Sequence, residues 1–201
     1  MGTRHLIAVQ KNGEYKVAQY GQWDGYFSGQ GDSILKFFHE NDLETFRTKV
    51  DNCFFGNQEQ IDEAYAPYTN GQGWMTFEQS EAFQQSEFGH LSRDTGAKIL
   101  DVIVNSNGPL ILVDQIDFAK DSLFCEFAYV IDLDKDILEV YEGFNTEPLP
   151  EGARFTGSSK DGGDYQAVKL VASFQLENLP ESFNELDKEL HPDNFEEEDE
   201  E

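Results

Sequence analysis

The stretch RHLIAVQKNGEYKVAQY (Arg4–Tyr20) decides how this chain begins to fold. It contains two runs rich in apolar and β-branched residues, RHLIAVQ and YKVAQY, and the tetrapeptide KNGE separates them. Asn12 and Gly13 both adopt positive φ readily, and an Asn-Gly pair between two such runs is a strong short-range signal for a β-hairpin. The sequence therefore predicts that the chain opens with an antiparallel hairpin.

A second hairpin is predicted near the carboxyl end, where LFCEFAYVIDL and ILEVYEGF flank the short turn DKD. PLILVDQ and YQAVKLVASFQL have the composition of single strands. Between the hairpins, residues 32–55 have apolar residues at helical spacing, residues 57–92 are expected to form short helices and loops, and residues 92–108 are expected to form a helix capped by Ser92. This order of elements predicts an α+β fold, with a mostly antiparallel sheet built from the two hairpins and helices packed on it.

The length of 201 residues fits one domain with a sizeable core, which is expected over residues 1–186. Residues 187–201 form an acidic tail that is expected to be disordered because it cannot bury apolar surface. The net charge is −26, of which residues 177–201 carry −11, and the remaining chain has no cluster of Lys or Arg. Such a surface repels nucleic acid and anionic lipid, so neither direct nucleic-acid binding nor membrane binding is expected.

Cys53 and Cys125 each lie in an apolar run, with no partner at the spacing of a zinc site. They are expected to be buried free thiols in a reducing compartment. The acids of DLDKDILEVYEG, residues 132–143, lack the Gly and the final Glu of a calcium loop, so no metal site is expected. The beginning of the chain lacks the apolar segment of a secretory signal. These features favour a cytoplasmic protein without a cofactor.

The glycine-rich segment YGQWDGYFSGQG (Tyr20–Gly31) follows the first hairpin and is the best candidate for a binding loop. A simple turn does not need so many rings and an acid, and a turn whose aromatic side chains cover the edge of the core is the alternative. Glycines before a helix can bring backbone N–H groups to an anion, although the spacing matches neither the dinucleotide fingerprint nor the phosphate loop. The expected ligand-binding residues in this loop are Tyr20, Trp23, Asp24, Tyr26, Gly29 and Gly31.

Further candidates for a site come from charged residues elsewhere in the sequence. Arg4, Arg93 and Asp94 are expected to lie near the same loop, and His5 and His90 are the candidates for acid–base chemistry. No Ser/His/Asp order or nucleophile elbow is present, so the sequence does not support a hydrolase of that kind.

The start GTRHLIAVQKNGEYKVAQY resembles the first hairpin of N-terminal-nucleophile hydrolases. This resemblance implies that Thr3 would be the nucleophile, with Lys36 or Asp24 assisting. The mechanism needs the free amine of Thr3 as the base, whereas ordinary removal of Met1 would expose Gly2, which cannot attack. Catalysis by Thr3 is therefore an alternative to a binding function.

Several motifs together resemble a widespread group of uncharacterised proteins from bacteriophages, prophages and bacteria: MGTRHLIAVQ, AQYGQWDGYFSGQG, LSRDTGAKILDVI and CEFAYVIDLDKDILEVYEGF. The resemblance extends to about Leu176, and Phe27 stands where the group has Pro. It implies no activity, but it implies expression from a phage or mobile element inside a bacterial host.

The sequence favours an accessory protein that acts by binding a small, nucleotide-like ligand or a host protein. A variant of this hypothesis makes the acidic surface itself the active feature, imitating nucleic acid toward a basic host protein. Both hypotheses place the protein in the cytoplasm of the host cell.

Overall fold

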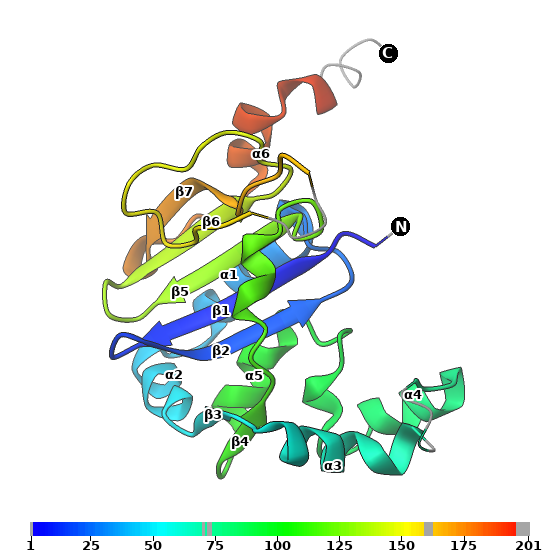
Figure 1. Ribbon diagram of the computed structural model, residues 1–201. Coiled ribbons are helices and arrows are strands. Elements are labelled where there is room, and N and C mark those ends of the chain that lie inside the picture. Colours follow the sequence, from blue (N-terminus) through cyan, green and yellow to red (C-terminus); the bar gives the residue numbers. More distant parts are fainter. Residues whose placement is uncertain (1, 70, 72–73, 159–162, 196–201) are drawn as a thin grey trace, which may run out of the picture.

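The computed structural model describes residues 2–69, 71, 74–158 and 163–195 (Figure 1). Its main sheet has five strands in the order β2-β1-β5-β6-β7. All neighbouring strands are antiparallel except β1 and β5, which are parallel. The predicted α+β fold with a mostly antiparallel sheet is therefore confirmed. The strands of the main sheet are β1 (His5–Lys11), β2 (Glu14–Gly21), β5 (Phe127–Asp132), β6 (Ile137–Glu142) and β7 (Lys169–Gln175).

Both predicted hairpins are present, and their turns are tied together. Asn12 and Gly13 have φ values of 57° and 75°, as the tight hairpin turn requires. Their N–H groups donate hydrogen bonds of 2.6 and 2.8 Å to the carboxylate of Asp134, which follows β5. Because β1 and β5 run in the same direction, the turn of the first hairpin lies beside the turn of the second.

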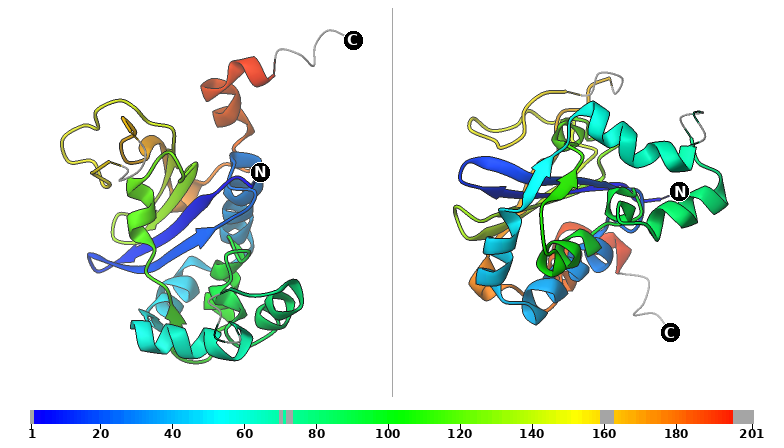
Figure 2. Two further views of the ribbon diagram at one scale, coloured as in Figure 1. Left: turned by 45° about the vertical axis from the view of Figure 1, so that its right-hand side comes forward. Right: turned by 90° about the horizontal axis from the view of Figure 1, so that it is seen from below.

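The helices α1 (Asp32–Glu40), α2 (Leu43–Val50) and α5 (Lys98–Asn105) lie on one face of the sheet (Figure 2). Side chains of successive strand residues point to opposite faces, so Ile7 and Val9 of β1 pack against these helices. Leu6 and Ala8 point to the other face, which the 3₁₀ turn Ile116–Lys120 and the loop after β6 cover. The core on the helical side includes Ile34, Leu35, Phe46, Ile99, Ile103, Tyr129 and Ile131.

Two sequence predictions need correction. The helix expected from Ser92 begins at Lys98 instead, because Gly96 adopts a φ of 51° and residues 92–97 follow a path fixed by hydrogen bonds to the loop after β2. The expected strand PLILVDQ shortens to β4 (Leu110–Leu112) and pairs in parallel with β3 (Cys53–Phe55) in a separate two-stranded sheet.

Residues 57–92 form a small helical lobe beside the sheet, in agreement with the short helices predicted for this segment. It contains α3 (Gln58–Thr69) and α4 (Phe77–Gln84), and the ring of Phe83 packs in its core with Ala64 and Leu91. The side chain of Thr76 caps α4. In Figure 1 this lobe projects from the lower part of the molecule.

At the carboxyl end, α6 (Asn184–Leu190) crosses the expected domain boundary at residue 186, and His191 contacts the carboxylates of Glu142 and Asp187. Folded structure thus continues past that boundary. Residues 196–201, which contain most of the acids of the expected tail, lie outside the described residues. Cys53 and Cys125 are buried free thiols, as predicted. None of the helices in the described ranges is long and apolar enough to cross a membrane.

Candidate functional site

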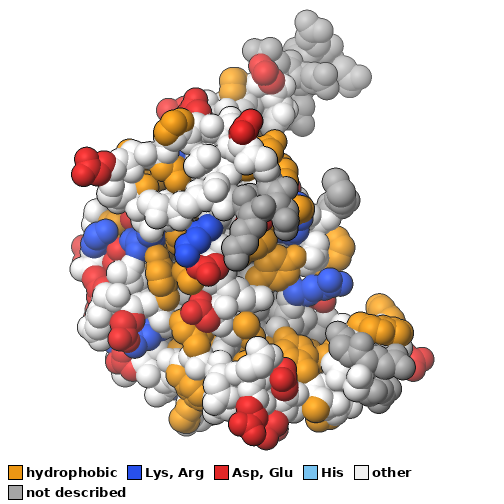
Figure 3. Space-filling model, viewed as in Figure 1, with side chains coloured by type: hydrophobic (Ala, Val, Ile, Leu, Met, Phe, Trp, Pro, Cys, Tyr) orange, Lys and Arg blue, Asp and Glu red, His pale blue; other side chains and the backbone are white. Residues whose placement is uncertain are grey.

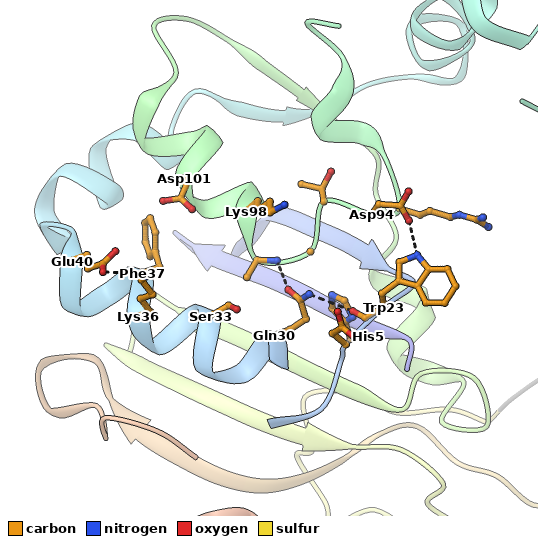
Figure 4. A pocket seen from close by; sticks show the side chains of 15 residues that line it. His5, Trp23, Gln30, Ser33, Lys36, Phe37, Glu40, Asp94, Lys98 and Asp101 are labelled. Atoms are coloured by element: carbon orange, nitrogen blue, oxygen red, sulfur yellow. Dashed lines mark hydrogen bonds and ion pairs between the residues drawn. The ribbon is translucent and has the colours of Figure 1, made fainter. Parts of the chain in front are cut away.

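A pocket of about 470 Å³ lies between α1 and α5, where the loop after β2 meets the segment before α5 (Figure 4). We call it the α1–α5 pocket. Residues from four parts of the chain line it: β1, the glycine-rich loop, α1 and residues 93–101. They are His5, Trp23, Asp24, Gln30, Ser33, Lys36, Phe37, Glu40, Arg93, Asp94, Thr95, Gly96, Ala97, Lys98 and Asp101.

Side-chain hydrogen bonds hold the two sides of this pocket together. The indole Nε1 of Trp23 donates to Asp94 Oδ1 at 2.8 Å. Gln30 donates through Nε2 to the Trp23 carbonyl at 3.3 Å, and its Oε1 accepts from the Ala97 N–H at 2.6 Å, at the start of α5. A Cβ on Gly96 would lie 2.4 Å from Gln30 Oε1, so only glycine allows this close approach. The pocket wall is therefore fixed by the fold.

The glycines expected to offer N–H groups to an anion have a different role. The N–H groups of Gly29 and Gly31 donate to the carbonyl of Tyr26 at 3.1 and 3.4 Å. A Cβ on Gly29 would lie 2.2 Å from the carbonyl oxygen of Asp24, and one on Gly31 would lie 3.0 Å from the hydroxyl of Tyr129. These two glycines therefore serve close packing in the loop.

His5 is the buried polar side chain of this pocket, and only 1% of its surface is exposed. It pairs with Gly21 across β1 and β2. A Cβ on Gly21 would lie 2.1 Å from Cε1 and Nε2 of the imidazole, and one on Gly25 would lie 2.8 Å from the Cβ of His5. The two glycines leave the space that the imidazole occupies.

Neither ring nitrogen of His5 has a hydrogen-bond partner of standard geometry among the residues that the structure describes, although a contact with the Thr3 backbone favours the protonated imidazole. Burial lowers the pKa of His5 from 6.5 to about 4, against smaller opposing effects of the Thr3 backbone and the Asp24 carboxylate. The imidazole is therefore neutral at pH 7, with one donor and one acceptor nitrogen. Buried polar groups without a partner are rare in folded proteins, and a bound water, ion or ligand is a common explanation.

The charged side chains around the pocket differ in how they are paired. Lys36 lies 3.8 Å from Glu40, one turn along α1. Arg93 and Lys98 form no ion pair or side-chain hydrogen bond within the described part of the chain, although most other cations there contact a carboxylate. Both carboxylate oxygens of Asp94 accept a hydrogen bond, because its second oxygen accepts one of 2.7 Å from a glutamine of α4. Arg93 and Lys98 are thus two lining cations without a carboxylate partner among the described residues.

The remaining sequence candidates lie elsewhere. Arg4 pairs with Glu126 at 3.2 Å, and its guanidinium lies over the ring of Phe124. The ring nitrogens of His90 contact the backbone carbonyls of Glu87 and Ile111 at 3.1 and 2.8 Å, which ties the lobe to β4. Neither side chain belongs to the α1–α5 pocket.

Three further candidates flank the pocket. Tyr20 lines a second, larger cavity beside α3 and α4, which also shares Trp23 with the α1–α5 pocket. The hydroxyl of Tyr26 donates to Asp24 at 3.1 Å, outside the pocket lining. Thr3 contributes its carbonyl to a hydrogen bond from the Gly25 N–H at 2.9 Å, and its proposed role as a nucleophile stays a prediction.

From α1, sequence reasoning named only Lys36, as a residue that could assist Thr3, and it missed the rest of the helix. Ser33, Lys36, Phe37 and Glu40 share one face of this helix, at spacings of three and four residues, and all four line the pocket. The spacing is visible in the sequence, but it identifies a site only when the facing element is known. That element is the start of α5, which the sequence placed too early.

Comparison with known proteins finds no match: no family model matches the chain, and the searches of curated proteins and of solved structures return no match either. The resemblance to N-terminal-nucleophile hydrolases is accordingly not confirmed. Among the described residues, no group of three or more His, Cys, Asp and Glu side chains is placed to hold a metal ion.

Proposed function

We propose that this protein binds a small organic anion containing a ring, of the size of a nucleoside monophosphate, in the α1–α5 pocket. The observation that carries the proposal is His5, a buried neutral imidazole that lines the pocket and whose two ring nitrogens have no hydrogen-bond partner of standard geometry among the described residues. A ligand that both accepts and donates a hydrogen bond would satisfy it.

The size and lining of the pocket support this class of ligand. Its volume of about 470 Å³ lies within the usual range for small-molecule sites. The indole of Trp23 is 47% exposed and is held in place by Asp94, so a planar ring can stack on it at little entropic cost. Arg93 and Lys98 are available to a phosphate or carboxylate. The carboxylate of Asp101, which also lines the pocket, can accept hydrogen bonds from the hydroxyl or amino groups of such a ligand.

This proposal fits an accessory role inside a bacterial host, as the resemblance to phage and prophage proteins implies. It needs binding alone and assigns no reaction to the pocket. Imitation of nucleic acid by the acidic surface and catalysis by Thr3 stay predictions, and no contact in the described residues favours either of them.

Native mass spectrometry and thermal unfolding in the presence of AMP, GMP, CMP, UMP and inorganic phosphate test the proposal. At least one nucleotide is expected to add its mass and raise the melting temperature, while phosphate alone has a smaller effect. Lys98→Gln should weaken that binding about 5–10-fold, because it removes a charge-assisted contact. The matched control Lys120→Gln, whose cation pairs with Asp117 on the other face of the sheet, should leave binding unchanged.

The proposal is wrong if no member of the panel binds, or if Lys98→Gln and Lys120→Gln reduce binding equally. The second result would show a general effect of net charge. Equal binding of phosphate and nucleotides would show that the pocket recognises only the anion and that Trp23 does not stack on a ring of the ligand.

A further inference from the structure

The second cavity is much larger than the pocket proposed above for a small ligand. It has a volume of about 1360 Å³ and lies between the helical lobe and the end of β2. Small-molecule pockets usually measure about 300–1,000 Å³, so this groove has the dimensions of a site for a peptide segment. We call it the lobe groove. In Figure 3 the lobe lies at the lower right, and hydrophobic side chains border the hollow beside it.

Exposed aromatic rings line the lobe groove. Trp74 is 60% exposed, Phe77 is 78% exposed, and Trp23 stands at the end that adjoins the α1–α5 pocket. The lobe does not need the rings of Trp74 and Phe77 for its own core, because Tyr65 stacks on Phe83 at a centroid distance of 4.7 Å in its interior. Large apolar side chains gathered in this way on a surface are typical of interaction sites.

The charge of the lobe specifies the partner. Residues 57–92 contain six acids and no Lys or Arg. Two of these acids, Asp62 of α3 and Glu81 of α4, line the groove itself, and Arg93 is the cation in its lining. A cation is therefore attracted both to the carboxylates and to the faces of Trp74 and Phe77. Anionic lipid and nucleic acid are repelled by the same charges.

From this combination we propose that the lobe groove binds a basic, apolar segment of a partner protein. Lys or Arg side chains of the segment pair with Asp62 and Glu81 and lie over the exposed rings, while its apolar side chains fill the space between α3 and α4. The groove is distinct from the anion pocket, because Trp74, Phe77, Asp62 and Glu81 do not line the α1–α5 pocket. The two sites meet only at Trp23, Arg93 and Asp94.

Fluorescence anisotropy with three labelled peptides tests this inference on the full chain. The first peptide contains Leu and Lys in the pattern of an amphipathic helix, the second replaces each Lys by Glu, and the third is oligolysine of the same length. The Leu/Lys peptide is expected to bind most tightly, and raising the salt concentration should weaken its binding. The Leu/Glu peptide should not bind measurably, and oligolysine should bind weakly.

Two variants locate the site. Trp74→Ala and Phe77→Ala are each expected to lower the affinity for the Leu/Lys peptide at least about 10-fold, because each removes a central aromatic contact. Phe144→Ala, which removes a ring of similar exposure beside β6, is the matched control and should bind as the wild type does. Because these side chains are exposed, circular dichroism should show unchanged folding.

Three results would overturn the inference. Equal binding of the Leu/Glu peptide would show that charge does not select the partner. Equal binding of oligolysine would show general attraction to an acidic protein. Unchanged binding by both lobe variants would place the peptide elsewhere on the surface.

Discussion

Replacing His5 by Leu should make the protein less sensitive to mild acid. The pKa of His5 is about 4 in the folded protein because of burial, against 6.5 for an unperturbed histidine. As the pH falls through 6.5, the unfolded chain takes up a proton at this position and the folded chain does not. The contribution of His5 to stability is therefore fully present above pH 6.5 and is lost as the pH falls toward 4.

The size of this effect follows from the two pKa values. Between pH 7 and pH 5 the protonation of unfolded His5 lowers the free energy of unfolding by about 2 kcal/mol, and by about 3 kcal/mol once the pH reaches 4. Leu cannot be protonated, so the variant lacks this loss. It also removes two buried nitrogens without partners, and replacing such groups by apolar atoms is close to neutral or stabilising. At pH 7 the variant should be at least as stable as the wild type.

Urea unfolding of both proteins at pH 7, 6 and 5, followed by circular dichroism, measures the effect. All other titratable groups are shared, so the difference between the two proteins isolates His5. The stability of the Leu variant relative to the wild type should rise by about 2 kcal/mol from pH 7 to pH 5. Parallel pH profiles would refute the assignment of a buried, neutral imidazole.

Three further changes test the packing around the site and the opposite face of the sheet. Gly21→Ala places a Cβ 2.1 Å from the imidazole and should lower the free energy of unfolding in urea by about 1–3 kcal/mol. In a protein that already carries His5→Ala, adding Gly21→Ala should not lower it. Gln30→Ala removes the hydrogen bond to the start of α5 and should lower the stability by about 1–2 kcal/mol, measured by thermal unfolding. Arg154→Met removes the guanidinium that pairs with Asp132 and Glu139, while Lys135 stays 3.4 Å from Asp132, and should cost about 1–3 kcal/mol in urea unfolding at pH 7.

Local chemistry explains which parts of the fold the sequence predicts. The hairpin turn depends only on Asn12 and Gly13 and their immediate neighbours, so it can be predicted from the local sequence, and the structure confirms it. The parallel pairing of β1 with β5 joins residues more than a hundred positions apart, and no local pattern encodes it. The helix expected from Ser92 failed for the same reason: the backbone N–H of Ala97 bonds to Gln30, a distant residue, and the segment before it follows the loop.

The candidate site shows the same division. The residue types of the glycine-rich segment and of the segment after His90 predicted Trp23, Asp24, Arg93 and Asp94, and the structure brings these four to one pocket. The environment of His5 depends on its cross-strand neighbour Gly21 and on the return of the loop at Gly25, neither of which is visible before the register is known. The aromatic residues of the lobe are visible in the sequence, but the weak helical periodicity of this stretch does not indicate that they line one groove.

The most direct test of the central claim is calorimetric titration of the nucleotide that binds best into the wild type, His5→Leu and Trp74→Ala. If the α1–α5 pocket holds the ligand through His5, the Leu variant should bind at least about 10-fold more weakly, and Trp74→Ala should bind as the wild type does. Equal affinity of the wild type and a folded His5→Leu variant would contradict the account.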